Sequence, residues 1–264
     1  SLRGLIGLTM KVEVLKEGVH SGGASGHVPS SFRIARKLLS LVEDENTGEI
    51  LVDELHTKIP EHRLKETETL VSILGDEVVQ EFPWKNDMKP STNDKVEGVL
   101  RRTWRPALSI VGSDGLPPTA NAGNVLRPYT TLQLSMRIPP MVDAKKARDA
   151  IKKKLTESIP YEASVKLHFE EAADGWNAPE TSPWLIKAIE KASENYFDEK
   201  PCSISEGGTI PFMAMLGERF PNAQFVITGV LGPQSNAHGP NEFLHIPFAK
   251  KLTCCISSII SDFK

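Results

Sequence analysis

Four short loops carry the side chains that could do chemistry in this sequence. His20 lies in the glycine-rich segment VHSGGASGH, where small neighbours leave its ring accessible to a ligand or a partner chain. Asn124 stands directly before a predicted strand, and Arg137 follows it on the polar face of the same strand. An amide and a guanidinium from one strand region can hold a carbonyl and a carboxylate, the guanidinium through two parallel hydrogen bonds. Taken alone, each is also an ordinary turn or strand residue.

The other two loops lie in the last third of the chain. The segment SEGGTIP precedes a predicted helix, so the N–H groups of Gly208 and Thr209 are expected at a helix N-terminus, where anions bind. His238 follows an apolar run and has Glu242 four positions later. A neutral imidazole with a nearby carboxylate could be a metal ligand with its supporting partner. The competing interpretation is that SEGGTIP is a plain helix-capping loop and that His238 is a loop histidine that binds no metal.

Composition excludes several classes of protein. The 264 residues include 31 Lys and Arg against 34 Asp and Glu, a formal net charge of −3, which excludes nucleic-acid binding driven by bulk positive charge. No apolar run approaches the roughly 18 to 20 residues of a membrane span, and the first residues lack the order of a signal peptide. Three cysteines without CxxC spacing do not predict a disulfide framework. We therefore expect a cytoplasmic protein with neither nucleic-acid nor membrane partners.

The first two thirds of the chain predict an α/β (α+β) domain. Period-2 and period-3.6 patterns alternate in the order strand, helix, strand, strand, helix, strand. These elements are expected at residues 5–17, 30–45, 106–112, 125–138, 142–155 and 161–170. This order is that of a ferredoxin-like domain, which we place at residues 5–172 with an insertion at about 46–103.

The remaining residues, 173–264, predict a different half. Helices are expected at 182–197 and 247–262, with a continuous apolar strand at 224–231 between them. One strand does not form a sheet. This half is therefore expected to need polypeptide from outside the chain and to expose apolar surface.

Taken together and in this order, the segments resemble the di-zinc metallopeptidase and amidohydrolase family. That family includes carnosine and Cys-Gly dipeptidases, carboxypeptidase G, acetylornithine deacetylase and succinyl-diaminopimelate desuccinylase. The matching segments are SLRG, HSG, RTWRPALSIVG, ANAGNVLRP, SMR, EGGTIP and NAHGPNE. They span essentially the whole chain, and the pattern is closest to the dipeptidases. The resemblance implies a ferredoxin-like lid, or dimerisation, domain followed by the C-terminal part of an α/β zinc-exopeptidase catalytic domain.

The resemblance also implies roles for individual residues. His20 would be the catalytic lid histidine that crosses a dimer interface and stabilises the oxyanion in the partner's site. Asn124 would contact the substrate near the scissile group, and Arg137 would bind the substrate's carboxylate. Gly208 and Thr209 would hydrogen-bond the same carboxylate from the catalytic domain. The implied assembly is a homodimer formed through the lid domain.

For the metal, the resemblance makes His238 a ligand of one of two zinc ions, with manganese or cobalt as alternatives. The family's other ligands, a His-x-Asp motif, a bridging Asp and a Glu-Glu pair, have no match in this sequence. We therefore expect a fragment, inactive alone, of a metal-dependent hydrolase. The parent would cleave amide bonds of dipeptides or N-acyl amino acids through a zinc-bound hydroxide. The alternative is a non-catalytic dimerisation module, a pseudoenzyme derived from that family.

Overall fold

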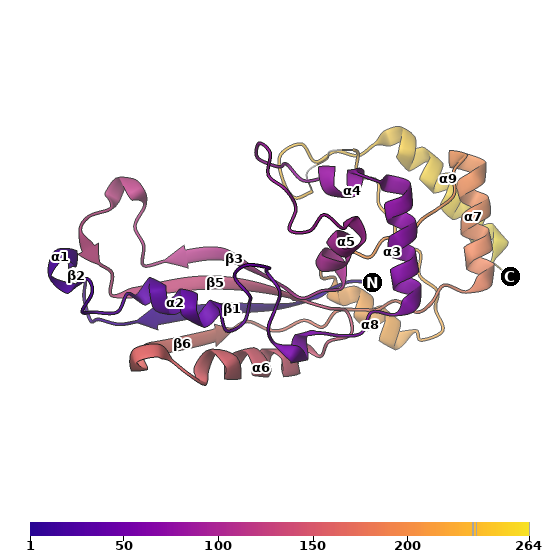
Figure 1. The fold of residues 1–264 in the computed structure, drawn as a ribbon. Helices are drawn as coiled ribbons and strands as arrows, with labels where there is room; N and C mark the ends of the chain where they lie inside the picture. The colour runs from indigo at the N-terminus through magenta and orange to yellow at the C-terminus, as the bar shows by residue number, and fades with distance from the viewer. Residues whose placement is uncertain (234, 236, 264) are drawn as a thin grey trace.

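A four-stranded antiparallel sheet forms the elongated end of the molecule (Figure 1). The computed structural model describes residues 1–233, 235 and 237–263. The sheet has the strand order β3-β5-β1-β6. Its strands are β1 (Gly4–Glu13), β3 (Ala107–Asp114), β5 (Tyr129–Ile138) and β6 (Ser164–Phe169). The central strand β1 pairs with both β5 and β6.

Two helices cover one face of this sheet, α2 (Ser31–Leu39) and α6 (Ala144–Thr156). Side-chain oxygens start both helices: Ser30 accepts from the Arg33 N–H, and Asp143 accepts from the N–H groups of Lys145 and Lys146. Alternate residues of the strands are apolar and buried beneath the helices. On β1 and β5 these are Ile6, Leu8, Met10, Val12, Leu132, Leu134, Met136 and Ile138. The α/β class and the ferredoxin-like order predicted from the sequence are therefore confirmed.

The far tip of the sheet carries a small second sheet. The strand β2 (Val19–His20) pairs with β4 (Val125–Leu126), and the short helix α1 (Ser21–Ala24) follows β2. Figure 1 shows this tip at the end of the molecule opposite α7 and the C-terminus. The loops around His20 and Asn124 thus form one structural unit.

The other end of the molecule is helical. It contains α3 (Glu61–Leu74), α4 (Glu77–Gln80), α5 (Lys95–Thr103), α7 (Pro183–Phe197), α8 (Pro211–Arg219) and α9 (Ile246–Asp262). Outside this helical end, the described residues also form short 3₁₀ turns at Asp53–Leu55, Thr119–Asn121 and Pro160–Glu162. Helices α7 and α9 pack together through Leu185, Ala188, Ala192, Cys255 and Ile259. None of the helices in the described ranges is both long and apolar enough to cross a membrane.

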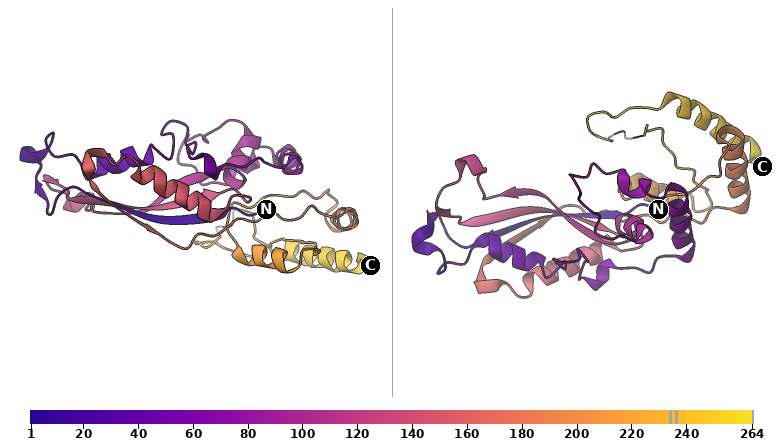
Figure 2. Two further views of the ribbon diagram at one scale, coloured as in Figure 1. Left: turned by 90° about the horizontal axis from the view of Figure 1, so that it is seen from below. Right: turned by 45° about the horizontal axis from the view of Figure 1, so that its top comes forward.

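The segment expected as an insertion at 46–103 lies against two different parts of the molecule. Its start completes the core of the sheet layer, because Ile50, Val52 and Leu55 are buried there. Its helices α3 to α5 instead lie beside the second half of the chain, as both views of Figure 2 show. Two contacts between buried groups fix them there: the Arg63 guanidinium donates to the Ala178 carbonyl at 2.8 Å, and the Trp104 indole N–H donates to Ser205 Oγ at 3.2 Å.

The apolar strand predicted at residues 224–231 is wrong. Residues 224–230 form no strand, and Leu231 makes only an isolated bridge to Leu244. No strand in the described part of the chain lies alongside them, and a single extended segment cannot satisfy its own backbone groups. Ile227 is 57% exposed and Val226 41% exposed. The expected exposure of apolar surface in this half is present.

Substitution of Gly175 tests the tightest junction between the two ends. A Cβ at Gly175 would lie 2.6 Å from the Pro140 Cα and 2.7 Å from the Leu2 carbonyl oxygen, both backbone atoms. Gly175→Ala should therefore lower the free energy of unfolding by about 1 to 3 kcal/mol. Gly123→Ala is the matched control because nothing lies within 4 Å of the place that its Cβ would take. Urea unfolding would measure both, and equal midpoints would contradict the close packing.

Candidate active site

Arg137 and Thr209 meet where the sheet joins the helical end. Arg137 lies near the end of β5, opposite Leu5 of β1 and Ala107 of β3. Its Nη1 donates to Thr209 Oγ1 at 2.9 Å. The Thr209 hydroxyl in turn donates to the Arg3 carbonyl at 2.7 Å. The structure thus brings together two residues that the resemblance assigns to carboxylate binding.

These hydrogen bonds limit what Thr209 can do. A hydroxyl has one proton, and Thr209 gives it to the Arg3 carbonyl, so the oxygen faces Arg137 as an acceptor. In this arrangement the hydroxyl orients the guanidinium and has no proton left for a bound carboxylate. Gly208 is also engaged, because its N–H donates to Glu206 Oε1 at 3.3 Å.

The position of this loop differs by a few residues from the sequence prediction. Helix α8 starts at Pro211 with Ile210 as its N-cap, so Gly208 and Thr209 stand just before the helix. Their N–H groups are therefore outside the first helical turn, where the orphan donors of a helix lie. The anion-binding capacity of the loop depends on Arg137 more than on the helix end.

Two guanidinium groups make this region electropositive. Arg3 is 9% exposed, and burial together with the nearby Arg137 lowers the pKa of Arg3 to about 10. It stays charged at neutral pH. Within the described residues, the ion pairs that arginines form involve Arg63, Arg101, Arg102, Arg105 and Arg148. Neither Arg3 nor Arg137 is among them, so both can attract an anion.

His20 and Asn124 lie together at the opposite end of the sheet. The Ser21 N–H donates to the Asn124 carbonyl at 2.9 Å, and His20 pairs with Val125. His20 is exposed and its side chain makes no capping hydrogen bond. The strand from Tyr129 to Arg137 alone spans about 26 Å at 3.3 Å per residue. The expectation that Asn124 and Arg137 hold one small ligand is therefore wrong within a single chain.

His238 lies in the exposed loop between Leu231 and Leu244. Its backbone has a φ of 61°, in the left-handed region, and its N–H donates to Glu242 Oε2 at 2.9 Å. The carboxylate of Glu242 thus fixes the loop backbone at His238. The neighbouring positions 234 and 236 lie outside the described residues. The imidazole is exposed and not packed in a core.

The described residues do not by themselves fit a zinc pair. Across residues 1–233, 235 and 237–263, no group of three His, Cys, Asp or Glu side chains is placed to hold a metal ion. A catalytic zinc takes three protein ligands, and His238 is the single candidate here. A hydrolytic step at zinc would therefore need ligands beyond those that these residues supply.

Two residues of the site had no role in the sequence prediction. Arg3 and Glu206 both contact the loop that carries Gly208. Both lie inside matched segments, SLRG and EGGTIP, yet neither has a spacing that marks it as functional. Only the fold places Arg3, 204 residues away in sequence, against Gly207.

Replacing the Thr209 hydroxyl should measure its bridging role. Thr209→Val keeps the shape of the side chain but leaves the Arg3 carbonyl without its donor and Arg137 without its acceptor. We expect a loss of about 1 to 2 kcal/mol in the free energy of unfolding. Thr209→Ser should restore most of it. Denaturant unfolding of the three proteins checks this, and equal stability of the Val and Ser variants would refute the bridge.

Comparison with known proteins gives consistent matches. Residues 1–162 match the peptidase dimerisation domain of the M20 family. The cysteinylglycine-S-conjugate dipeptidase of Corynebacterium striatum is 23% identical over 261 residues, which cover 94% of this chain and 54% of the relative. The Cys-Gly metallodipeptidase dug1 of Schizosaccharomyces pombe is 25% identical over 215 residues, covering 80% of this chain and 44% of the relative. The chain spans about half the length of these relatives.

Solved structures show the same fold. The Saccharomyces cerevisiae dipeptidase Dug1p has a TM-score of 0.76 at 20% identity and covers 99% of this chain and 54% of its own. Human carnosine dipeptidase 1 has a TM-score of 0.75 at 18% identity and covers 99% of this chain and 55% of its own. At these identities the likeness shows the fold alone. With the family match over more than half of its residues, this chain belongs to the M20 family of metallopeptidases and carries its dimerisation domain.

Proposed function

We propose that this chain is part of a metal-dependent peptidase that hydrolyses dipeptides with a free C-terminal carboxylate. One copy of the chain contributes Arg137, Thr209 and His238, and a second copy contributes His20 and Asn124 to the same site. The observation that supports this proposal is the placement of the two groups at opposite ends of the sheet domain, with Arg137 in the four-stranded sheet and His20 in the small sheet at its far tip. A site that uses both needs two copies of the chain.

The carboxylate preference is supported by the charge and geometry around Arg137. Its guanidinium lies beside the buried cation Arg3, and Thr209 holds it through one of its five N–H donors. A carboxylate accepts a guanidinium fork through two parallel hydrogen bonds. Both curated relatives are named as dipeptidases, which favours dipeptides over N-acyl amino acids as substrates.

The metal requirement is supported by family membership and by the exposed His238. The M20 metallopeptidase family implies a divalent metal, for which zinc is our proposal and manganese or cobalt the alternatives. Because the described residues contain one candidate ligand, the remaining ligands are proposed to come from polypeptide outside this chain. We further propose that the enzyme is a homodimer through the sheet domain and that it is cytoplasmic.

A second candidate is a non-catalytic dimerisation module. It is favoured by the family match itself, which covers the dimerisation domain at residues 1–162. The paired arrangement of Arg137, Thr209 and Arg3 weighs against it, because dimerisation alone does not require an anion site.

Complementation between two inactive variants tests the proposal. In the full-length protein that carries this chain, His20→Ala should lower Cys-Gly hydrolysis by about 100- to 1,000-fold, as loss of an oxyanion donor does. His238→Ala should abolish it. Each variant lacks a different half of the shared site, so a heterodimer keeps one intact site. A reassembled equimolar mixture should recover about a quarter of wild-type activity.

The control for these variants is His168→Ala. His168 is exposed on the polar face of the sheet and has no assigned role, so this variant should keep full activity. No recovery in the mixture, with dimers present, would reject a shared site. An inactive wild-type protein that still dimerises would favour the non-catalytic module.

A further inference from the structure

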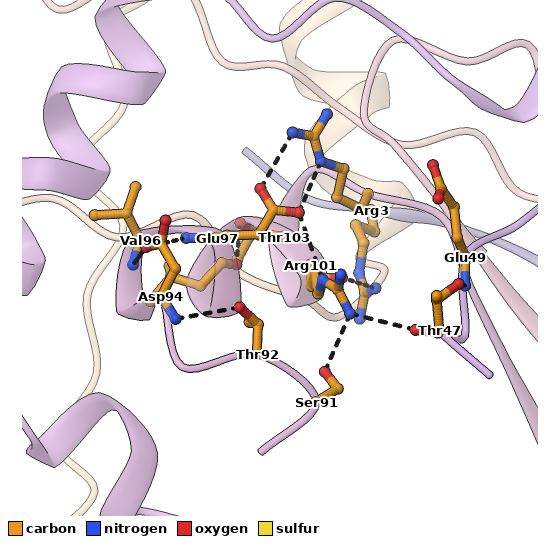
Figure 3. Close-up of polar contacts among 12 residues, drawn as sticks. Arg3, Thr47, Glu49, Ser91, Thr92, Asp94, Val96, Glu97, Arg101 and Thr103 are labelled. Atoms are coloured by element: carbon orange, nitrogen blue, oxygen red, sulfur yellow. Dashed lines mark hydrogen bonds and ion pairs between the residues drawn. The ribbon is translucent and has the colours of Figure 1, made fainter.

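Arg3 is a buried cation that bridges three separate segments. It stands directly before β1, and its Nε donates to the Gly207 carbonyl at 3.1 Å. Its Nη1 donates to the Arg101 carbonyl at 3.4 Å. Its own backbone carbonyl accepts the Thr209 hydroxyl at 2.7 Å. Figure 3 shows Arg3 next to Arg101, whose guanidinium reaches Thr47 and Ser91 on its other side.

The end of helix α5 explains how this charge is tolerated without an ion pair. Arg101 lies in the last turn of α5, where carbonyl groups lack intrahelical partners. The negative end of the helix dipole favours a cation at that place. Arg3 therefore caps α5 and offsets part of the cost of its own burial. Its positive charge forms no ion pair within the described residues, and the nearby Glu206 carboxylate favours the charged form.

The loop at Gly207 is held tightly between Arg3 and α5. A Cβ at Gly207 would lie 2.6 Å from the Arg102 carbonyl oxygen and 3.1 Å from Arg3 Nη2. The carbonyl that Arg3 holds thus belongs to a residue with no room for a side chain beside the helix. Gly208 and Thr209 follow directly, so their positions relative to Arg137 depend on this contact.

We propose that Arg3 is a positioning residue for a carboxylate subsite. Its Nε bonds the Gly207 carbonyl and its backbone carbonyl accepts the Thr209 hydroxyl, and together these bonds set the place of the 206–209 loop beside the Arg137 guanidinium, which binds the carboxylate. The ligand is a small peptide with a free C-terminal carboxylate, and this part rests on the proposed function. Arginine is required because its planar fork reaches two carbonyls in fixed directions, which a lysine ammonium does not reproduce.

An NMR titration of the 264-residue chain with the dipeptide Gly-Gly tests this inference. The backbone N–H signals of Gly207 and Gly208 and the Nε–H signal of Arg137 should shift on addition of Gly-Gly. The C-terminal amide of Gly-Gly should leave them unchanged. Arg3→Lys keeps a charge but loses the fork, so the Kd for Gly-Gly should rise by about tenfold.

Two matched variants keep the test decisive. Arg148→Lys changes a half-buried arginine on α6 that pairs with Asp149, and it should bind Gly-Gly as the wild type does. Should Arg3→Lys fail to fold, Arg3→Gln is a second side-chain variant: it keeps an N–H donor for the Gly207 carbonyl but loses the fork and the charge, and it should weaken binding about equally. Wild-type Kd values in the Arg3 variants would overturn the inference, as would equal binding of the dipeptide amide.

The titration also separates this inference from the proposed function. Carboxylate binding that depends on Arg3, in a full-length protein without hydrolytic activity, would reject the peptidase and keep the positioning role. Hydrolytic activity together with a Kd for the carboxylate that does not change in the Arg3 variants would keep the peptidase and reject the positioning role.

Discussion

The antiparallel pairing of β1 determines most of this structure. Within the sheet, β1 is bonded to β5 over its whole length and to β6 over its second half. Before the sheet, the same stretch of chain continues toward the helical end. There Leu2 exchanges backbone hydrogen bonds with Trp176, and the Ser1 carbonyl accepts the Glu206 N–H at 2.9 Å. One continuous extended segment therefore fixes both the sheet and the loop that carries Thr209.

This continuity explains why Arg137 and Thr209 meet where they do. Arg137 is placed by its register opposite Leu5, and Thr209 is placed by its bond to the Arg3 carbonyl, two residues earlier on the same strand extension. Neither position depends on a long flexible connection. The glycines at this crossing, Gly4 and Gly175, leave no space for side chains, so the two backbones lie in direct contact. Groups held in this way are preorganised, which lowers the entropic cost of binding a ligand.

The sequence predicted the sheet domain well because its patterns are strong. Ten residues of β5 alternate half-buried and buried positions, and Asp143 gives α6 a clear start. The apolar run at 224–231 has an equally strong strand composition, but a strand exists only with a neighbour, and periodicity does not report neighbours. The helices α3 to α5 lie beside the second half because of contacts such as that between Arg63 and Ala178, which no local pattern encodes.

The sequence motifs identified candidate site residues but did not show how far apart these residues lie in the structure. Asn124 and Arg137 are close in sequence yet separated by the length of β5, whereas Arg3 and Gly207 are far apart in sequence and in contact. Arg3 was missed because a single arginine beside a glycine has no periodicity or spacing that distinguishes it. The roles of His20, Asn124, Arg137, Gly208, Thr209 and His238 stay proposals.

The sheet domain is long, and the residues proposed for the site lie at both of its ends. Arg137 lies close to the crossing of Gly4 and Gly175, while His20 stands at the far tip. A change of about 10° in the angle at that crossing would move a tip about 30 Å away by roughly 5 Å, given the rise of a strand. The position of His20 relative to the helical end therefore depends on how closely the two backbones are held at Gly4 and Gly175, where no side chain would fit.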